Sequence, residues 1–345
     1  MGELKIHMTL DYEVWGNGNG CVIDCMINPT NHLLSIADHF NLKTTLFVDI
    51  CEYWAFKETE ESDLFKDKSY KPASLIEEQL KDVIRRGYDV QLHFHPQWLN
   101  YRIIDDYKFE LDFNLWRVSS LELGDFDKKN TLKWLFYRGK ESLENLLQPV
   151  SATYKCTTFR AGAWCIQPEE MVLKAMESVG IFWDSTVAPK MKLSESLTNY
   201  NFQKAPSKNE WKFNDKVSKE DKSGMFTEYP IHTLKYSWRS QLYYYFKRIS
   251  LQKAREKKCI GGGISKSRTF VSRILKKIIQ RYHMFDFTTG MSAAELTYQF
   301  DQAKRKYKKE LENNDIEIIA IAHPKNFSQG VELVSFLNGI NINGS

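Results

Sequence analysis

The sequence has no long apolar run. No stretch of about eighteen apolar residues occurs in it, so a membrane-spanning helix is not expected. The opening residues, MGELKIHMTLDYE, lack the apolar core of a secretory signal and start almost at once on a strand-like pattern. The six cysteines are scattered through the chain without a paired framework. These absences predict free thiols and a cytoplasmic protein.

Phosphate-binding and nucleic-acid-binding motifs are missing as well. The glycine-rich stretches GNGNG (16–20) and GGG (261–263) lack the Lys-Ser/Thr ending of a phosphate loop, so we expect flexible turns there. Positive charge is concentrated in residues 236–283, which contain 13 Lys and Arg and one acidic residue, whereas the remainder has 35 basic and 43 acidic residues. No nucleic-acid-binding motif accompanies this charge, so nucleic acid is not an expected partner.

Strand-like and helical patterns alternate along the chain. Apolar, strand-like segments are expected at 4–13, 43–50, 89–95, 154–162, 181–187 and 316–324. Patterns with helical spacing occur at 29–42, 72–87, 127–147, 167–180 and 292–314. This order predicts an α/β protein whose parallel strands have helices outside them and close into a barrel.

One strand-like segment contains two histidines. In GYDVQLHFHPQW (87–98), apolar and polar residues alternate until Pro96. His93 and His95 then point to the same face of a strand, where two neutral imidazoles can bind one cation. The alternative is a pair of polar residues with ordinary hydrogen bonds at a strand edge.

Ionisable side chains lie at the ends of several expected strands. In a parallel barrel, chemistry gathers at the carboxyl ends of the strands. This sequence places two carboxylates two residues apart after the first strand and further ionisable groups after the others: Asp11, Glu13, His93, His95, Arg160, Asp184 and His323. We therefore expect one site that combines them.

The order of the motifs TLDYE, LHFHP, FRAGAW, DSTV and IAHP resembles that of the polysaccharide deacetylases, the NodB-homology carbohydrate esterases. The resemblance runs from Thr9 to Pro324 and is strongest to the cytoplasmic branch found with surface-polysaccharide genes. It implies a distorted (β/α)7 barrel, here one domain over residues 1–345 with a basic helical insertion at 236–283. It also implies a divalent-metal hydrolase, with zinc the first choice, that removes acyl groups from sugars.

Roles for individual residues follow from this resemblance. It implies that Asp11 is the catalytic base, that Glu13 and His93 bind the metal, and that Arg160 orients the base. Asp184 would be the supporting acid of this arrangement.

The remaining two roles concern His323 and the second metal histidine. The resemblance makes His323 the general acid. Most family members place the second metal histidine where this chain has Gln97. Glutamine is a poor zinc ligand and His95 faces the same way as His93, so we assign His95 to the metal. Asp11 and Glu13 could exchange roles.

Two features could serve binding or only packing. Trp15, Trp98 and Trp164 each follow a motif and could contact a sugar, although tryptophan is often part of a core. Residues 267–285 (SRTFVSRILKKIIQRYHMF) place apolar residues on one helical face and Lys and Arg on the other. Such a helix can lie on an anionic membrane or simply cover the barrel.

These patterns support two classes of function. The first is a cytoplasmic, metal-dependent N-deacetylase that acts on a nucleotide- or lipid-linked acylated amino sugar during synthesis of bacterial surface polysaccharide (O-antigen or capsule), in peripheral contact with the inner membrane face. Removal of a formyl group from a lipid-linked amino sugar is a close variant. A base together with an acid favours amide over ester cleavage, because a departing amine must be protonated. The second class is a degenerate, non-catalytic carbohydrate-binding barrel, suggested by the altered histidine spacing.

Overall fold

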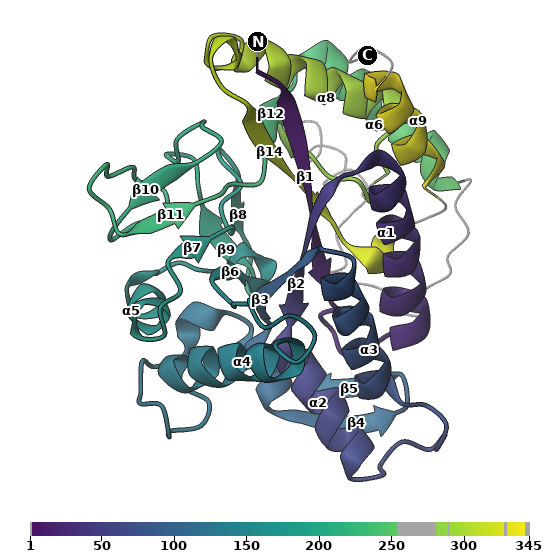
Figure 1. Ribbon diagram of the computed structural model, residues 1–345, viewed down its shortest axis with the longest axis vertical. Helices are drawn as coiled ribbons and strands as arrows, with labels where there is room; N and C mark the ends of the chain where they lie inside the picture. The colour runs from purple at the N-terminus through teal and green to yellow at the C-terminus, as the bar shows by residue number, and fades with distance from the viewer. Residues whose placement is uncertain (1, 254–280, 289, 328–329, 342–345) are drawn as a thin grey trace.

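A twisted sheet of eight strands forms the centre of the protein. The computed structural model describes residues 2–253, 281–288, 290–327 and 330–341. The strand order is β10-β11-β7-β6-β3-β2-β1-β14 (Figure 1). Every neighbouring pair from β11 to β14 is parallel, and only β10 at the edge is antiparallel. The strands are β1 (Leu4–Tyr12), β2 (Lys43–Asp49), β3 (Asp89–Phe94), β6 (Thr158–Ala161), β7 (Trp183–Asp184), β10 (Trp211–Phe213), β11 (Phe226–Glu228) and β14 (Ile316–Ala322).

Two loop segments extend the sheet beyond β14. Ile231 makes a parallel bridge to Ile319, and Asp286 makes one to Ile321. The chain that leaves β11 thus crosses directly to β14, at the opposite edge of the sheet. The sheet is therefore curled, and loops rather than regular strands span the gap between its edges. This confirms the predicted α/β fold with a distorted barrel.

Helices surround the curled sheet (Figure 1). Those expected from the sequence are α1 (Asn28–Phe40), α3 (Pro72–Arg85), α4 (Leu132–Leu147), α5 (Glu170–Ser178) and α8 (Ala293–Lys306). The others are α2 (Ile50–Glu61), α6 (Trp238–Lys253) and α9 (Val331–Asn341). None of the described helices is long and apolar enough to cross a membrane.

Helix α2 was not expected from the sequence. It has buried residues on several sides, so its apolar residues do not form the single face that predicts a helix. It begins where the Asp49 carboxylate accepts hydrogen bonds from the backbone N–H groups of Cys51 and Glu52. A side chain that accepts from the first N–H groups of a helix satisfies donors that have no partner within the helix. A local cap and tertiary burial thus specify this helix.

Strand β6 is shorter than the predicted 154–162. The Gln91 side-chain oxygen accepts the backbone N–H groups of Thr157 and Thr158, each at 2.8 Å. These donors are satisfied by a side chain, so the regular ladder begins only at Thr158.

Three small antiparallel pairs lie outside the main sheet and were not expected from the sequence. They are β4 (Tyr101–Asp105) with β5 (Lys108–Leu111), β8 (Lys192–Ser194) with β9 (Asn199–Asn201), and β12 (Thr233–Lys235) with β13 (Tyr282–Met284). The β12–β13 pair is the base of the basic segment 236–283, whose first part is α6. In the amphipathic pattern at 267–285, Tyr282–Met284 form strand β13, so the predicted helix is wrong at this end. Residues 267–280 of the pattern lie outside the described residues, so a helix there stays a prediction.

The cysteines that the structure describes are buried. Cys21, Cys51, Cys156 and Cys165 are free thiols, as expected. Cys25 is disulfide-bonded, so the expectation of free thiols throughout is wrong for this residue.

Candidate active site

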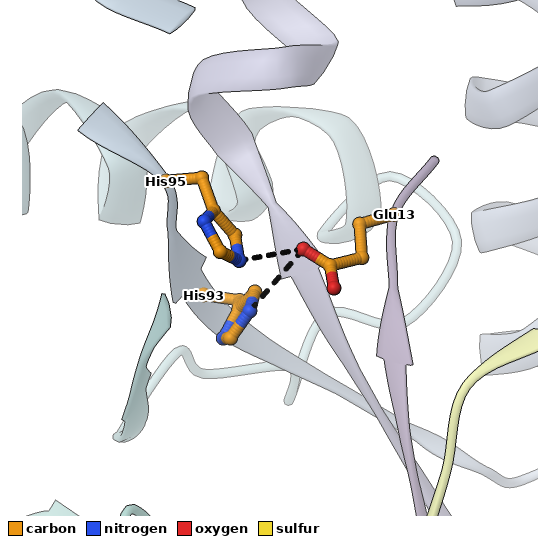
Figure 2. Close-up of side chains that lie close together, drawn as sticks. All are labelled: Glu13, His93 and His95. Atoms are coloured by element: carbon orange, nitrogen blue, oxygen red, sulfur yellow. Dashed lines mark ion pairs between the residues drawn. The ribbon is translucent and has the colours of Figure 1, made fainter. Parts of the chain in front are cut away.

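Three buried side chains converge at the carboxyl ends of β1 and β3. Glu13 follows β1, His93 lies in β3, and His95 comes directly after it. His95 Nε2 lies 2.7 Å from Glu13 Oε2, and His93 Nε2 lies 3.7 Å from the same oxygen (Figure 2). One ligand atom from each residue fits within 4.8 Å of the others, which is the spacing of a metal site. The two imidazoles predicted to share a face do share one.

His93 is held in the tautomer that a metal ligand requires. Its Nδ1 lies 2.9 Å from the Arg160 backbone carbonyl, which can only accept, so Nδ1 donates. Its buried Nε2 has no hydrogen-bond partner among the described residues. A histidine ring whose far nitrogen donates to a carbonyl presents its other lone pair to a cation. This unsatisfied nitrogen fits a divalent ion.

His95 is in contact with Gln97, the residue that the sequence analysis set aside as a metal ligand. Gln97 Nε2 lies 3.1 Å from His95 Nδ1, and the buried Gln97 Oε1 has no hydrogen-bond partner within the described part of the chain. Gln97 Nε2 also donates to the Gly16 carbonyl at 3.4 Å. Turning the amide by half a rotation gives up that bond and places Oε1 against Nδ1, which then carries the proton and leaves Nε2 free for a cation. The Gly162 backbone packs closely against the His95 ring. A Cβ on Gly162 would lie 2.9 Å from that ring, so a larger residue would displace it.

Lys325 is a charged neighbour of this cluster that the sequence analysis did not identify. Its Nζ donates to Glu13 Oε1 at 2.5 Å and to the Val14 carbonyl at 2.9 Å. Burial alone would raise the pKa of Glu13, but the charges of His95 and Lys325 outweigh it and hold that pKa well below its usual range. Glu13 is thus ionised, as a metal ligand must be.

The predicted catalytic base lies beside this cluster. Asp11 Oδ1 accepts from Arg160 Nη1 at 2.6 Å, and Asp11 Oδ2 lies 3.3 Å from His323 Nε2. Burial raises the pKa of Asp11, but the Arg160 charge and the contact with His323 outweigh it and lower the pKa overall. Burial lowers the pKa of His323, but the hydrogen bond with Asp11 and the Asp11 charge outweigh burial, so the pKa is raised overall. The pair therefore favours an ionised Asp11 and a protonated His323.

Arg160 is fully buried and fixed by several partners. Its guanidinium donates to Thr9 Oγ1 at 3.0 Å, to Ser185 Oγ at 2.9 Å and to the Ser185 carbonyl at 2.8 Å. It also lies 4.1 Å above the Phe47 ring. A guanidinium held at this many points can orient Asp11 without moving itself.

Asp184 does not take the place expected for a supporting acid. Among the contacts of the described residues, no hydrogen bond or ion pair joins it to Arg160, and Ser185 occupies that position. Asp184 instead accepts from the Thr186 hydroxyl at 2.7 Å. Burial raises the pKa of both Asp184 and its neighbour Glu228. Any support that Asp184 gives to Arg160 is therefore indirect.

Asp49, at the end of β2, is a site residue that the sequence analysis missed. Its Oδ1 accepts the His95 backbone N–H at 3.1 Å while also capping α2. Burial raises the pKa of Asp49 to about 6, and its Oδ2 has no partner among the described residues. An aspartate that ends a buried strand, as in TLDYE, was the signal that could have identified it.

The predicted sugar-contacting tryptophans have different environments. Trp164 is half-buried, with its ring 6.3 Å from the His323 ring, and Trp15 is half-buried, 5.7 Å from Lys325 Nζ. Trp98 is a correction: it is buried in the core against Phe56 and Phe109, so neither face of its indole is available to a ligand.

A further aromatic ring was not predicted. Trp116 lies 6.0 Å from His95, and a Cβ on Gly16 would lie 3.2 Å from its ring. Trp116, Trp15 and Trp164 are therefore three tryptophans whose rings lie beside His95, Lys325 and His323.

Comparison with known proteins gives structural similarity only. No protein-family model matches the chain, and no curated protein matches its sequence. A polysaccharide deacetylase from Bacillus cereus is 9% identical, with a TM-score of 0.36 over 99% of this chain and 88% of that one. A Mycobacterium smegmatis structure described as a polysaccharide deacetylase is 12% identical, with a TM-score of 0.44 over 98% of this chain and 84% of that one. The allantoinase PuuE is 9% identical, with a TM-score of 0.44 over 99% of this chain and 84% of the allantoinase chain. Polysaccharide deacetylases, the family that the motifs resemble, are thus among the structures to which this chain is similar.

Proposed function

We propose that this protein is a metal-dependent hydrolase that removes an N-acyl group from an amino sugar during synthesis of a bacterial surface polysaccharide. The observation that supports this most directly is the position of the Glu13–His93–His95 cluster beside Asp11. A cation-binding cluster next to an ionised carboxylate and a histidine is the set of groups that hydrolysis of an amide needs.

Glu13, His93 and His95 would hold a divalent ion, with zinc the first choice for this ligand set. Such an ion polarises a carbonyl oxygen and lowers the pKa of a bound water from 15.7 towards about 7. Asp11 accepts the proton of the attacking water, and Arg160 keeps Asp11 ionised and oriented. His323 donates a proton to the nitrogen as the C–N bond breaks, leaving the free carboxylic acid and the amino sugar.

The protonation states favour an amide over an ester as the substrate. Burial lowers the pKa of His323, but its hydrogen bond with Asp11 and the Asp11 charge outweigh burial and raise the pKa, which favours the protonated ring that a general acid needs. An amine leaves only after it is protonated, whereas an alkoxide has less need of an acid. Trp15, Trp116 and Trp164 add rings on which a sugar can stack.

The complete cation cluster argues against a degenerate, non-catalytic barrel. A binding barrel needs neither an unpartnered histidine nitrogen nor a carboxylate held ionised beside it. An N-acetyl and an N-formyl group present the same carbonyl to this site, so the acyl group and its carrier are left for experiment.

The experiment is to measure acid release by the purified, zinc-loaded protein. Nucleotide-linked N-acetylated and lipid-linked N-formylated amino sugars are supplied, and acetate or formate is identified by mass. We expect release from one of these classes and none from Asp11→Asn. If no acid appears while one equivalent of zinc is bound, the chain is a carbohydrate-binding barrel and not a hydrolase.

A further inference from the structure

Helix α6 (Trp238–Lys253) has an exposed apolar face on its outer side. Its exposed fractions are 67% for Trp238, 39% for Leu242, 60% for Tyr243 and 61% for Phe246. Trp238, Leu242 and Phe246 are four residues apart, so they form one row along the helix. Exposed apolar residues scattered singly are ordinary, but a contiguous row of large ones marks an interaction surface.

The inner side of α6 is attached to the protein by other residues. Gln241 contacts His283 at 2.6 Å, the Tyr244 hydroxyl donates to the Ala294 carbonyl at 3.4 Å, and Arg248 pairs with Glu295. At 100° per residue, these residues are centred about 130° around the helix from the exposed row. Among the described residues, α6 is therefore attached through these contacts and not through the exposed row.

The charge around this row has one sign. Residues 236–253 contain no Asp or Glu but include Arg239 and Lys247 near the exposed row. The Arg239 guanidinium lies 5.4 Å above the Trp238 ring. Tryptophan and tyrosine concentrate at the boundary between lipid headgroups and acyl chains, and Lys and Arg beside them are attracted to anionic lipids.

Contacts through α8 connect helix α6 to the segment that holds His323. Arg248 pairs with Glu295 in the first turn of α8. The segment just before that turn contains Thr288, whose hydroxyl accepts the backbone N–H of His323. One connected segment, Thr288 to Glu295, thus joins α6 to His323 at the carboxyl end of β14.

We propose that the exposed face of α6 binds an anionic lipid surface, with Trp238, Leu242, Tyr243 and Phe246 in the headgroup region and Arg239 and Lys247 against the lipid phosphates. The inference is independent of the proposed hydrolysis, because it rests on α6 alone. It gives a physical reason for a lipid-linked substrate to be within reach of the site.

The test is flotation of the full-length protein with vesicles of phosphatidylcholine, with and without phosphatidylglycerol. We expect binding only to the anionic vesicles, weakened at physiological ionic strength, where the Debye length is about 8 Å. Trp238→Ser with Phe246→Ser should reduce partitioning at least about tenfold. Arg239→Gln with Lys247→Gln should remove most of the salt dependence.

A matched control separates this face from general surface hydrophobicity. Leu64→Ser with Phe126→Ser changes two exposed apolar residues on other parts of the surface, and these variants should bind like the wild type. Thermal melting confirms that each variant folds, and acid release from a soluble substrate should be unchanged. Wild-type protein that ignores anionic vesicles at low salt overturns the proposal. So does a dimer that dissociates when Trp238 and Phe246 are replaced, because the face would then join two copies of the chain.

Discussion

At the scale of single residues, the proposed metal ligands and the proposed base are different side chains. Glu13, His93 and His95 surround one position, whereas Asp11 is engaged by Arg160 and His323. We therefore expect His93→Ala and His95→Ala each to lose bound zinc, and Asp11→Asn to keep zinc while losing turnover by at least about 10²-fold. Zinc content after dialysis, measured by atomic absorption, and acid release check both parts. Full zinc occupancy in His95→Ala would remove His95 from the ligand set.

Gln97 allows a sharper residue-scale prediction. If its amide oxygen accepts the His95 Nδ1 proton when zinc is bound, Gln97→Leu should weaken zinc binding about 10–100-fold, as loss of a group that orients a metal histidine does. Gln97→Glu should retain affinity, because a carboxylate accepts the same proton. Competition with a chromophoric chelator measures both constants. Equal affinity in Gln97→Leu and the wild type would show that His95 needs no such partner.

At the scale of secondary-structure elements, the sequence predicted which strands carry candidate site residues at their carboxyl ends, but it did not predict every residue of the site. Alternation of apolar and polar residues was enough to place His93 and His95 together, and the apolar strand before Asp11 placed that carboxylate. Asp49, Lys325 and the orienting role of Gln97 were missed. Their roles depend on contacts between segments distant in the chain, such as the Asp49 contact with the His95 backbone, and no local pattern encodes such contacts.

The connection between β2 and α2 gives an element-scale prediction. Asp49 caps α2 and also holds the backbone N–H of His95, so one carboxylate links the helix start to a metal ligand. Asp49→Ala should lower the free energy of unfolding by about 1–2 kcal/mol through the lost cap and should weaken zinc binding as well. Asp49→Asn, which keeps an accepting oxygen, should lose less of both. Urea unfolding and chelator competition supply the two measurements, and an unchanged Asp49→Ala protein would refute the link.

At the scale of the whole molecule, the sheet is extended across its gap by loops that the sequence did not reveal. The segment around Ile231 crosses from β11 to β14, and the segment around Asp286, which follows β13, also bridges to β14. Their backbone hydrogen bonds, from His232 N to the Ile319 carbonyl and from Phe287 N to the Ile321 carbonyl, join distant parts of the chain. Short loops with such long-range partners have no hydrophobic period that sequence reasoning could detect.

His232, in the first of these loops, makes the stability of the whole fold depend on pH. Its ring is buried near Phe285 and Tyr307, and its Nε2 has no hydrogen-bond partner in the part of the chain that the structure describes. Burial lowers the pKa of His232 to about 3, below its ordinary value of 6.5. Between these two values the unfolded chain binds a proton that the folded protein does not, so stability falls as the pH falls through this window.

We therefore predict that wild-type protein loses more stability between pH 7 and pH 5 than His232→Leu does. The difference should be about 2 kcal/mol, since each pH unit below 6.5 contributes about 1.4 kcal/mol. Urea unfolding at both pH values measures it, and the other ionisable groups cancel because they are common to both proteins. His39→Gln, at an exposed histidine of α1, serves as the control and should behave like the wild type. Equal losses of stability in wild type and His232→Leu would contradict the prediction. They would mean that His232 is protonated in the folded protein as readily as in the unfolded chain, and therefore that water reaches the loop that crosses from β11 to β14.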